Sequence, residues 1–274
     1  MKTNFSCPVC RSVLSREDKT YRCADNHCFD IAKQGYVNLL RSQKSSKKRH
    51  GDDTLMVKSR QDFLEKDYYL PLREEIVRAV KSIAGEECIL LDLGCGECWY
   101  TADIYRKLTE SGVSAQVFGI DISKQALIYG AKRCSELNLA VASTAEIPLG
   151  DESCDVCLCV FAPYSEAEIL RVLKKGGAFI KVFPLEDHLM GLKTAIYDKP
   201  YKNEVSREIG EGFDEASFVS VMNNIVLTSG EDIMNLFRMT PYYYKTGRED
   251  QQKVEKLEYL KTEICFGISV YIKR

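Results

Sequence analysis

The sequence has no apolar run long enough to cross a membrane, and its first residues lack the pattern of a signal peptide. We therefore expect a soluble, cytoplasmic protein that makes no membrane contact. The sequence also lacks a marked excess of either charge, because its formal net charge is −2 over 274 residues. This balance excludes a chain that is basic overall, so any basic surface for nucleic acid must be local.

Cysteine, in contrast, is abundant, with twelve residues, most of which stand singly within apolar runs. This usage favours reduced thiols in a cytoplasm, with a subset of the cysteines binding metal. Cys154, Cys157 and Cys159 alternate with Val and Leu, as residues of a buried strand do, so we predict that they pack in the core. We predict the same for Cys95 and Cys98.

A group of metal-binding residues lies near the N-terminus. Cys7 and Cys10 form a C-x2-C pair, and Cys23 with His27 follows after a spacer. Two such pairs can complete a tetrahedral zinc site, and so small a module needs a metal because it buries little apolar surface. Cys28 is an alternative to His27 as the fourth ligand, but we prefer His27 because a C-x3-H pair reaches back comfortably. The alternative to a zinc site is that these cysteines are reduced thiols that bind no metal.

Basic and aromatic side chains are interleaved around this cysteine group. Such a pattern suits RNA backbone and unstacked bases, or simply a solvated rim over a few core aromatics. Residues 42–53 are polar and basic, and we interpret them as a linker that could follow phosphates or merely remain in water. We therefore divide the chain into a zinc-binding RNA-recognition module (1–41), a basic linker (42–53) and a larger domain (54–274).

The larger domain contains a glycine motif. A short apolar run ends in Asp92, and Gly94 and Gly96 follow in a turn before a predicted helix. The next apolar run ends in Asp121, where a doubly wound fold binds a ribose diol. Asp92 would repel a pyrophosphate but favours the cationic S-adenosylmethionine, and the third glycine of the dinucleotide motif is missing. We predict an S-adenosylmethionine site, with a ligand-free strand–turn–helix junction as the alternative.

Strand and helix patterns alternate through this domain. Parallel strands are predicted at 88–93, 116–120, 139–142, 155–160 and 178–183, and helices between them at about 98–110, 123–136 and 165–174. Two long strands at 217–227 and 263–272 are expected to form an antiparallel hairpin at one edge. The prediction is an α/β fold with a seven-stranded sheet, preceded by helices at 53–66 and 74–83 with a break at 68–72.

These features together resemble the Rossmann-like S-adenosylmethionine methyltransferases. The N-terminal C-x2-C and C-x3-H pairs narrow the resemblance to the 23S ribosomal RNA guanine-N1 methyltransferases. So do four further runs: Phe29-Asp30 to Gly35-Tyr36-Val37-Asn38-Leu39-Leu40, Tyr69-x-Pro71-Leu72, Asp92-x-Gly94-Cys95-Gly96-Glu97 and His188-Leu189-Met190-x-Leu192-Lys193. The resemblance covers nearly the whole chain, although Cys98 and Trp99 stand where the family usually has a glycine and an aromatic residue.

The resemblance implies methylation of guanine N1 in a hairpin loop of 23S rRNA by a homodimeric enzyme. It implies structural zinc (Zn²⁺) on the residues Cys7, Cys10, Cys23 and His27. It assigns cofactor contacts to Tyr69, Gly96, Glu97 and His188, and the wider methyltransferase pattern adds Asp92, Gly94 and Asp121.

A candidate floor for the guanine follows the fourth strand, at the carboxyl edge where open sheets bind ligands. It consists of Phe161, Ala162 and Pro163, and a plain strand-to-helix turn is the alternative. No residue is identified as the catalytic base, since the resemblance assigns His188 to the cofactor. Three other functions remain open: methylation of a small molecule such as a quinone precursor, zinc-dependent RNA binding without catalysis, and nicotinamide chemistry.

Overall fold

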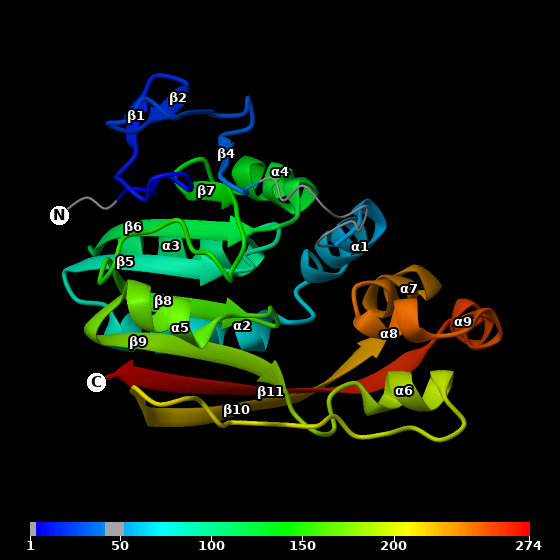
Figure 1. Cartoon of the computed structure of the whole chain (residues 1–274). Helices are drawn as coiled ribbons and strands as arrows, with labels where there is room; N and C mark the ends of the chain where they lie inside the picture. Colours follow the sequence, from blue (N-terminus) through cyan, green and yellow to red (C-terminus); the bar gives the residue numbers. More distant parts are fainter. Residues whose placement is uncertain (1–3, 42–51) are drawn as a thin grey trace.

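The computed structural model describes residues 4–41 and 52–274, and an eight-stranded sheet runs through it (Figure 1). The strand order is β10-β11-β9-β8-β5-β6-β7-β4. The strands are β4 (Tyr36–Asn38), β5 (Glu87–Leu93), β6 (Ser114–Asp121), β7 (Asn138–Val141), β8 (Cys154–Val160), β9 (Leu173–Pro184), β10 (Phe213–Leu227) and β11 (Leu260–Lys273). Neighbours are parallel from β4 to β9, whereas β11 is antiparallel to both β9 and β10.

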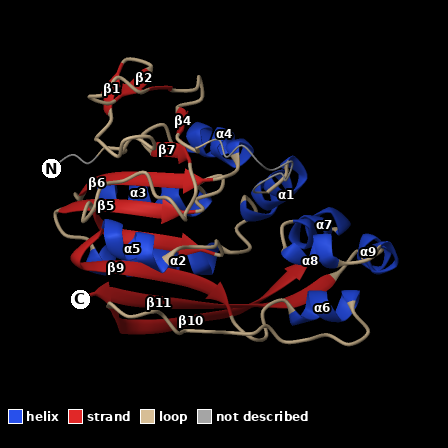
Figure 2. Ribbon diagram, viewed as in Figure 1, coloured by secondary structure: helices blue, strands red, loops and turns tan. Residues whose placement is uncertain are grey.

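The helices cover the sheet from both sides. Their bounds are α1 (Thr54–Leu64), α2 (Leu70–Ile83), α3 (Trp99–Glu110), α4 (Lys124–Arg133), α5 (Glu166–Val172), α6 (Met190–Ile196), α7 (Gly230–Arg238), α8 (Pro241–Lys245) and α9 (Arg248–Glu255). In Figure 2, α2 and α3 lie behind the sheet and α5 lies in front of it. A small separate sheet is formed by β1 (Ser15–Glu17), β2 (Thr20–Arg22) and β3 (Cys28–Asp30).

Strand β5 lies at the centre of the core, which explains its apolar sequence. Six of its seven residues are buried, because both faces of a parallel sheet are covered by other elements. Successive side chains point to opposite faces, so Leu90 joins one hydrophobic cluster and Leu91 joins the other. The predicted packing of the cysteines in β8 is confirmed, since Cys154, Cys157 and Cys159 are all buried and free.

The predicted number of strands was wrong by one. The eighth strand, β4, comes from the N-terminal region, and it pairs in parallel with β7 through Tyr36↔Leu139 and Asn38↔Val141. A segment of three residues is too short to show a recognisable strand pattern. Because these residues follow the cysteine group closely in sequence, the pattern predicts that they belong to the N-terminal module.

Helix α2 also begins earlier than predicted. Pro71 was expected to break the chain, but it occupies the first turn of α2, where a missing N–H costs nothing and the fixed φ of proline favours a helix. The antiparallel strands β10 and β11 confirm the predicted edge hairpin. Within residues 4–41 and 52–274, no helix has the length and apolar character needed to cross a membrane.

The N-terminal region packs closely on the main sheet. Phe5 is 1% exposed, and its ring centroid lies 5.1 Å from that of Phe118 in β6. Arg11 Nη2 lies 3.0 Å from Glu146 Oε1, in the loop after β7. The division at residues 41 and 53 remains a prediction, and all of the predicted basic linker except its last two residues lies outside the described residues.

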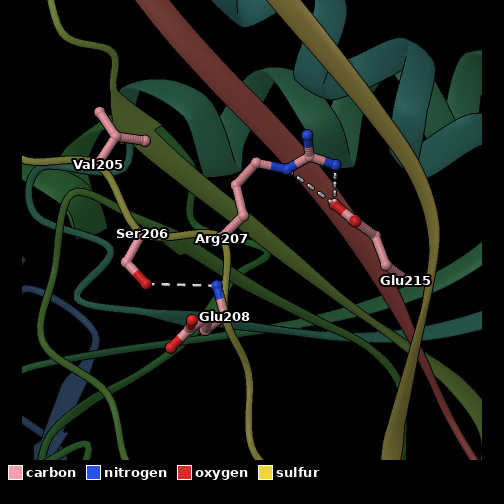
Figure 3. Close-up of a pocket in the computed structure, with 5 residues that line it drawn as sticks. All are labelled: Val205, Ser206, Arg207, Glu208 and Glu215. Carbon is pink, nitrogen blue, oxygen red and sulfur yellow. Dashed lines mark hydrogen bonds and ion pairs between the residues drawn. The ribbon is translucent and has the colours of Figure 1, made fainter.

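Residues 197–212 contain no helix or strand and lie beside a shallow hollow of about 480 Å³. Figure 3 shows the residues that line it, which are Val205, Ser206, Arg207, Glu208 and Glu215. The guanidinium of Arg207 pairs with Glu215 at 2.6 Å and stacks on the ring of Phe218 at 3.9 Å. We assign no ligand to this shallow hollow.

Candidate active site

A cavity of about 700 Å³ lies at the carboxyl ends of the parallel strands. All the predicted cofactor contacts line it, namely Tyr69, Asp92, Gly94, Gly96, Glu97, Asp121 and His188. The predicted floor residues Phe161, Ala162 and Pro163 line the same cavity. The fold therefore brings together residues that are far apart in the sequence, in a volume suited to a nucleoside-sized ligand and part of a second molecule.

The turn after β5 requires glycine. Gly94 and Gly96 have φ angles of +74° and +56°, in the left-handed region that glycine adopts without steric cost. A Cβ on Gly94 would lie 2.4 Å from Cβ of Ala162, so a side chain there would collide with the loop after β8. The backbone of this turn thus forms one wall of the cavity and directly opposes the predicted guanine floor.

Cys98 precedes the first residue of α3 and adopts φ +61°. Its side chain is fully buried against Gly130 of α4. A Cβ on Gly130 would lie only 2.6 Å from Cys98 Sγ, so the missing side chain on α4 provides the space for the cysteine. The cysteine side chain is therefore accommodated at this left-handed position.

Two buried carboxylates in the cavity have oxygens without partners. Asp92 Oδ2 accepts a hydrogen bond from Thr101 Oγ1 at 2.5 Å, whereas Asp92 Oδ1 and Glu97 Oε1 have no hydrogen-bond partner. Burial raises the pKa of Asp92 to about 7 and also raises the pKa of Glu97. Because buried polar groups are normally paired, these oxygens fit a ligand that carries positive charge or N–H donors.

Asp121 is held rigidly at the end of β6. Its Oδ2 accepts the backbone N–H of Gly96 at 2.9 Å, and its Oδ1 accepts that of Ser123 at 2.7 Å. Each carboxylate oxygen can accept a further hydrogen bond. The carboxylate can therefore accept hydrogen bonds from a diol without losing the two that orient it.

His188 lines the cavity as a neutral hydrogen-bond donor rather than as a base. Its Nδ1 accepts the backbone N–H of Cys265 at 3.2 Å, so the proton of the neutral ring is on Nε2. Burial lowers the pKa of His188 to about 3, which keeps the ring neutral at physiological pH. Phe266 lies against the ring, with centroids 4.4 Å apart.

The cavity has an aromatic lip. Phe161 adopts φ +58°, a conformation that is strained for an aromatic residue, and its side chain is 45% exposed. Its ring centroid lies 5.3 Å from that of Phe266, which belongs to β11. An exposed ring held by a strained backbone beside a cavity is a typical feature of a ligand-binding position.

The N-terminal cysteines form a second cluster. The ligand atoms of Cys7, Cys10, Cys23 and His27 all lie within 4.8 Å of one another, and in residues 4–41 and 52–274 no other His, Cys, Asp or Glu group meets this criterion. Cys23 Sγ lies 3.3 Å from His27 Nδ1, as two ligands of one tetrahedral zinc ion can. Cys28 is exposed, and its Sγ contacts the carbonyl of Asn26 instead.

Sequence patterns did not reveal the wall of the cavity that faces the glycine turn. This wall includes Arg60 from α1, Tyr242 from α8 and Phe266 from β11. Arg60 has no motif around it, and Phe266 follows the pattern of any buried strand. The run Pro241-Tyr242-Tyr243-Tyr244 was the available signal, since clustered aromatics often line a ligand site.

A parallel sheet with an antiparallel edge, a glycine turn with two unpaired acids and a four-ligand metal cluster define a Rossmann-like methyltransferase with a zinc ribbon. Comparisons with known families agree. Residues 5–48 match the family described as "RlmA, N-terminal", a zinc ribbon, and residues 91–181 match a methyltransferase domain.

Two curated relatives are similar over much of the chain. A Streptomyces fradiae protein named 23S rRNA (guanine(748)-N(1))-methyltransferase is 35% identical over 194 residues, which cover 69% of this chain and 66% of that protein. YxjB of Bacillus subtilis, provisionally assigned the same type of activity, is 30% identical over 98% of this chain and 96% of its own length. Among solved structures, YcgJ of Bacillus subtilis has a TM-score of 0.49 at 13% identity and covers 74% of this chain and 97% of that one.

The chain belongs to the 23S rRNA (guanine-N1)-methyltransferase family. It is therefore an enzyme that uses S-adenosylmethionine and has a structural zinc site.

The affinity for S-adenosylmethionine should rise with pH, because only ionised Asp92 attracts the cationic cofactor. With a pKa of about 7, this carboxyl is mostly protonated near pH 6 and mostly ionised near pH 8. We expect the dissociation constant to fall by about tenfold across this interval. Calorimetric titration at several pH values measures it, and Asp92→Asn should bind weakly with a much flatter pH dependence. An equally steep dependence in that variant would assign the effect to another group.

Proposed function

We propose that this protein methylates N1 of a guanine in a hairpin loop of 23S rRNA, with S-adenosylmethionine as the methyl donor. Family membership and the activity for which the Streptomyces fradiae relative is named support the proposal. The observation that carries it is the cavity in which an unpaired Asp92 oxygen and the aromatic lip at Phe161 line the same space. One side of this cavity suits a cationic cofactor, and the other suits a flat base.

The proposed cofactor contacts divide by chemistry. Asp92 and Glu97 offer unpaired carboxylate oxygens to the positive charges of the cofactor, and Asp121 accepts hydrogen bonds from the ribose.

The other proposed contacts are uncharged. The backbone at Gly94 and Gly96 provides a close surface without side chains. The remaining two, Tyr69 and His188, border the cavity near Phe266 and offer neutral hydrogen-bond donors to the methionine end.

The substrate half has to bind and orient the guanine. S-adenosylmethionine supplies an electrophilic methyl group, while guanine N1 becomes a good nucleophile only after it loses its proton. Phe161 offers a ring for base stacking, and Ala162 with Pro163 forms the floor against the glycine turn. The neutral, Nδ1-accepting His188 does not remove this proton, so we assign no catalytic base. Alignment of N1 with the methyl group is then the main contribution of the chain.

We infer that Cys7, Cys10, Cys23 and His27 bind the zinc ion, and that residues 1–41 recognise RNA beside the domain at 54–274. Exposed Arg16 and Lys19 on this module support RNA contact. Cytoplasmic localisation is supported by the cysteines, since none of the twelve, all of which are described, forms a disulfide bond.

A homodimer is part of the same proposal. Strand β10 forms an open edge of the main sheet, and Val219, Met222 and Val226 on it are exposed. Unpaired edge strands with apolar side chains readily pair with a second chain. Light scattering should give about twice the 31.1 kDa mass of one chain.

Primer extension on ribosomal RNA tests the function directly, because a methyl group on guanine N1 blocks base pairing. RNA from cells with the gene should stop reverse transcriptase at one loop guanine, and RNA from cells without it should not. Methylation of a small-molecule extract with no stop in the RNA would contradict the proposal. It would favour a small-molecule methyltransferase, although such an enzyme has no evident use for the zinc ribbon.

Substitution of Phe161 by alanine should lower turnover by about tenfold to 100-fold, because base stacking on an aromatic ring contributes about 1–3 kcal/mol. The affinity for S-adenosylmethionine should stay within about twofold of the wild type, since the ring lies on the substrate side of the cavity. Single-turnover methylation of rRNA measures the first quantity and calorimetry the second. Unchanged turnover would remove Phe161 from the guanine site.

A further inference from the structure

Arg60 occupies an unusual position for an arginine. It belongs to α1, borders the cavity, and has a side chain that is only 25% exposed. A Cβ on Gly96 would lie 4.0 Å from Arg60 Nη1, so the guanidinium lies directly over the cofactor turn. Its pKa is raised above its ordinary value by Asp52, Glu97 and Asp121, although burial acts in the opposite direction.

The charges around the cavity are strongly unbalanced. Among the described residues that line it, Asp52, Asp92, Glu97 and Asp121 are acidic, and Arg60 is the only lysine or arginine. His188, which is neutral, adds no positive charge. S-adenosylmethionine carries two positive groups, the sulfonium and the ammonium, and one negative group, the carboxylate. These acids favour the positive groups of the cofactor, and Arg60 is the cationic side chain among the described lining residues that can pair with its carboxylate.

Arg60 has a carboxylate partner within its own chain. Arg60 Nη1 lies 2.5 Å from Asp52 Oδ2, and the Asp52 backbone carbonyl accepts a hydrogen bond from Ser123 Oγ at 3.2 Å. The Asp52 side chain is 32% exposed, so it can turn toward solvent while its backbone stays in place. An arginine fork binds a carboxylate through two parallel N–H bonds, which makes one carboxylate a direct substitute for another.

We propose that Arg60 binds the carboxylate of the methionine part of S-adenosylmethionine, and that this carboxylate displaces Asp52. The inference rests on the proposed function and adds a cofactor-binding residue outside the glycine motif. Asp52 then acts as a competitor for Arg60. It keeps the guanidinium paired and directed at the turn until the cofactor arrives.

A purely structural ion pair makes different predictions. If the pair only fixed the start of α1 over the glycine turn, loss of either partner would weaken every adenosine ligand to a similar extent. Under our proposal, loss of Arg60 weakens only ligands that carry the carboxylate. Loss of the Asp52 charge strengthens the binding of those same ligands.

Calorimetric titration with three ligands separates these cases. S-adenosylhomocysteine has the carboxylate, decarboxylated S-adenosylmethionine keeps the ammonium without it, and 5′-methylthioadenosine lacks the whole amino acid. Arg60→Ala should weaken S-adenosylhomocysteine by about 30-fold or more, as expected when one partner of a buried charge pair is removed. The other two ligands should change by less than about threefold. Asp52→Asn should bind S-adenosylhomocysteine several-fold more tightly than the wild type.

Arg133→Ala is a matched control. Arg133 Nε donates to the Glu97 carbonyl at 3.1 Å, so this arginine supports the same turn without lining the cavity. Its removal should affect all three ligands equally. Arg60→Gln keeps a donor without the charge, and it tests the proposal if the alanine variant fails to fold.

Two results would overturn the inference: equal weakening of all three ligands in both Arg60 variants, or weaker binding of S-adenosylhomocysteine by Asp52→Asn. A wild-type protein that bound none of the ligands would instead contradict the proposed function, and the inference would fail with it.

Discussion

Gly94→Ala should reduce the affinity for S-adenosylmethionine by about 100-fold or more, because it imposes two separate costs. An alanine at φ +74° is strained by roughly 1–2 kcal/mol. Its Cβ would also lie 2.4 Å from that of Ala162, a collision that displaces either the turn or the guanine floor. Calorimetric titration with S-adenosylhomocysteine measures the loss.

Two further variants separate the backbone strain from the collision. Gly112→Ala places alanine at φ +82° with no atom within 4 Å, so it should lose a little stability and keep full cofactor affinity. Adding Ala162→Gly to Gly94→Ala removes the colliding methyl group and should restore part of the affinity. Wild-type binding by Gly94→Ala alone would show that the cofactor does not use this turn.

Cys23→Ser should lose the zinc ion and lower the melting temperature by about 10 °C or more, since structural zinc contributes several kcal/mol to folding. The effect should extend beyond the N-terminal region. Cys23 and Cys7 belong to the same buried cluster as Phe118 and Ile120 of β6, so a disordered metal site would loosen the packing on the sheet. Zinc content by atomic emission and thermal unfolding provide the two measurements.

Cys28→Ser is the matched control for the metal site. Its thiol is exposed and lies outside the four-ligand cluster, so this variant should keep one zinc per chain and the wild-type melting temperature. If Cys28→Ser loses the zinc ion while His27→Ala retains it, the fourth ligand is Cys28 and not His27. This result would favour the alternative that the sequence left open.

Local sequence signals predicted those parts of the molecule whose chemistry depends on neighbours in the chain. The turn at Gly94 and Gly96 was recognisable because its backbone geometry restricts the residue type at each position. The metal ligands were recognisable for a related reason, since two close pairs leave few ways to complete a tetrahedron. The candidate site was thus largely predictable wherever a short segment carries its own constraint.

Other features depend on contacts between distant segments and left no such signal. Strand β4 has only three residues and is a strand because β7 supplies its hydrogen-bond partners. Arg60 is a polar residue on an ordinary helix until the fold places it over Gly96, some 36 positions along the chain. Phe266 was predicted within a strand, but its proximity to Phe161 follows only from the order of strands in the sheet.

The pairing of β4 with β7 has a practical consequence for dissecting this enzyme. Deletion of residues 1–41 would remove the outermost strand and expose the backbone N–H and C=O groups of β7 that face β4, while those that face β6 stay paired. A freshly exposed strand invites pairing between copies, so such a truncated catalytic fragment is prone to aggregate. Loss of activity in that fragment would then report damage to the sheet, and point substitutions on the zinc ribbon surface are the safer way to probe RNA recognition.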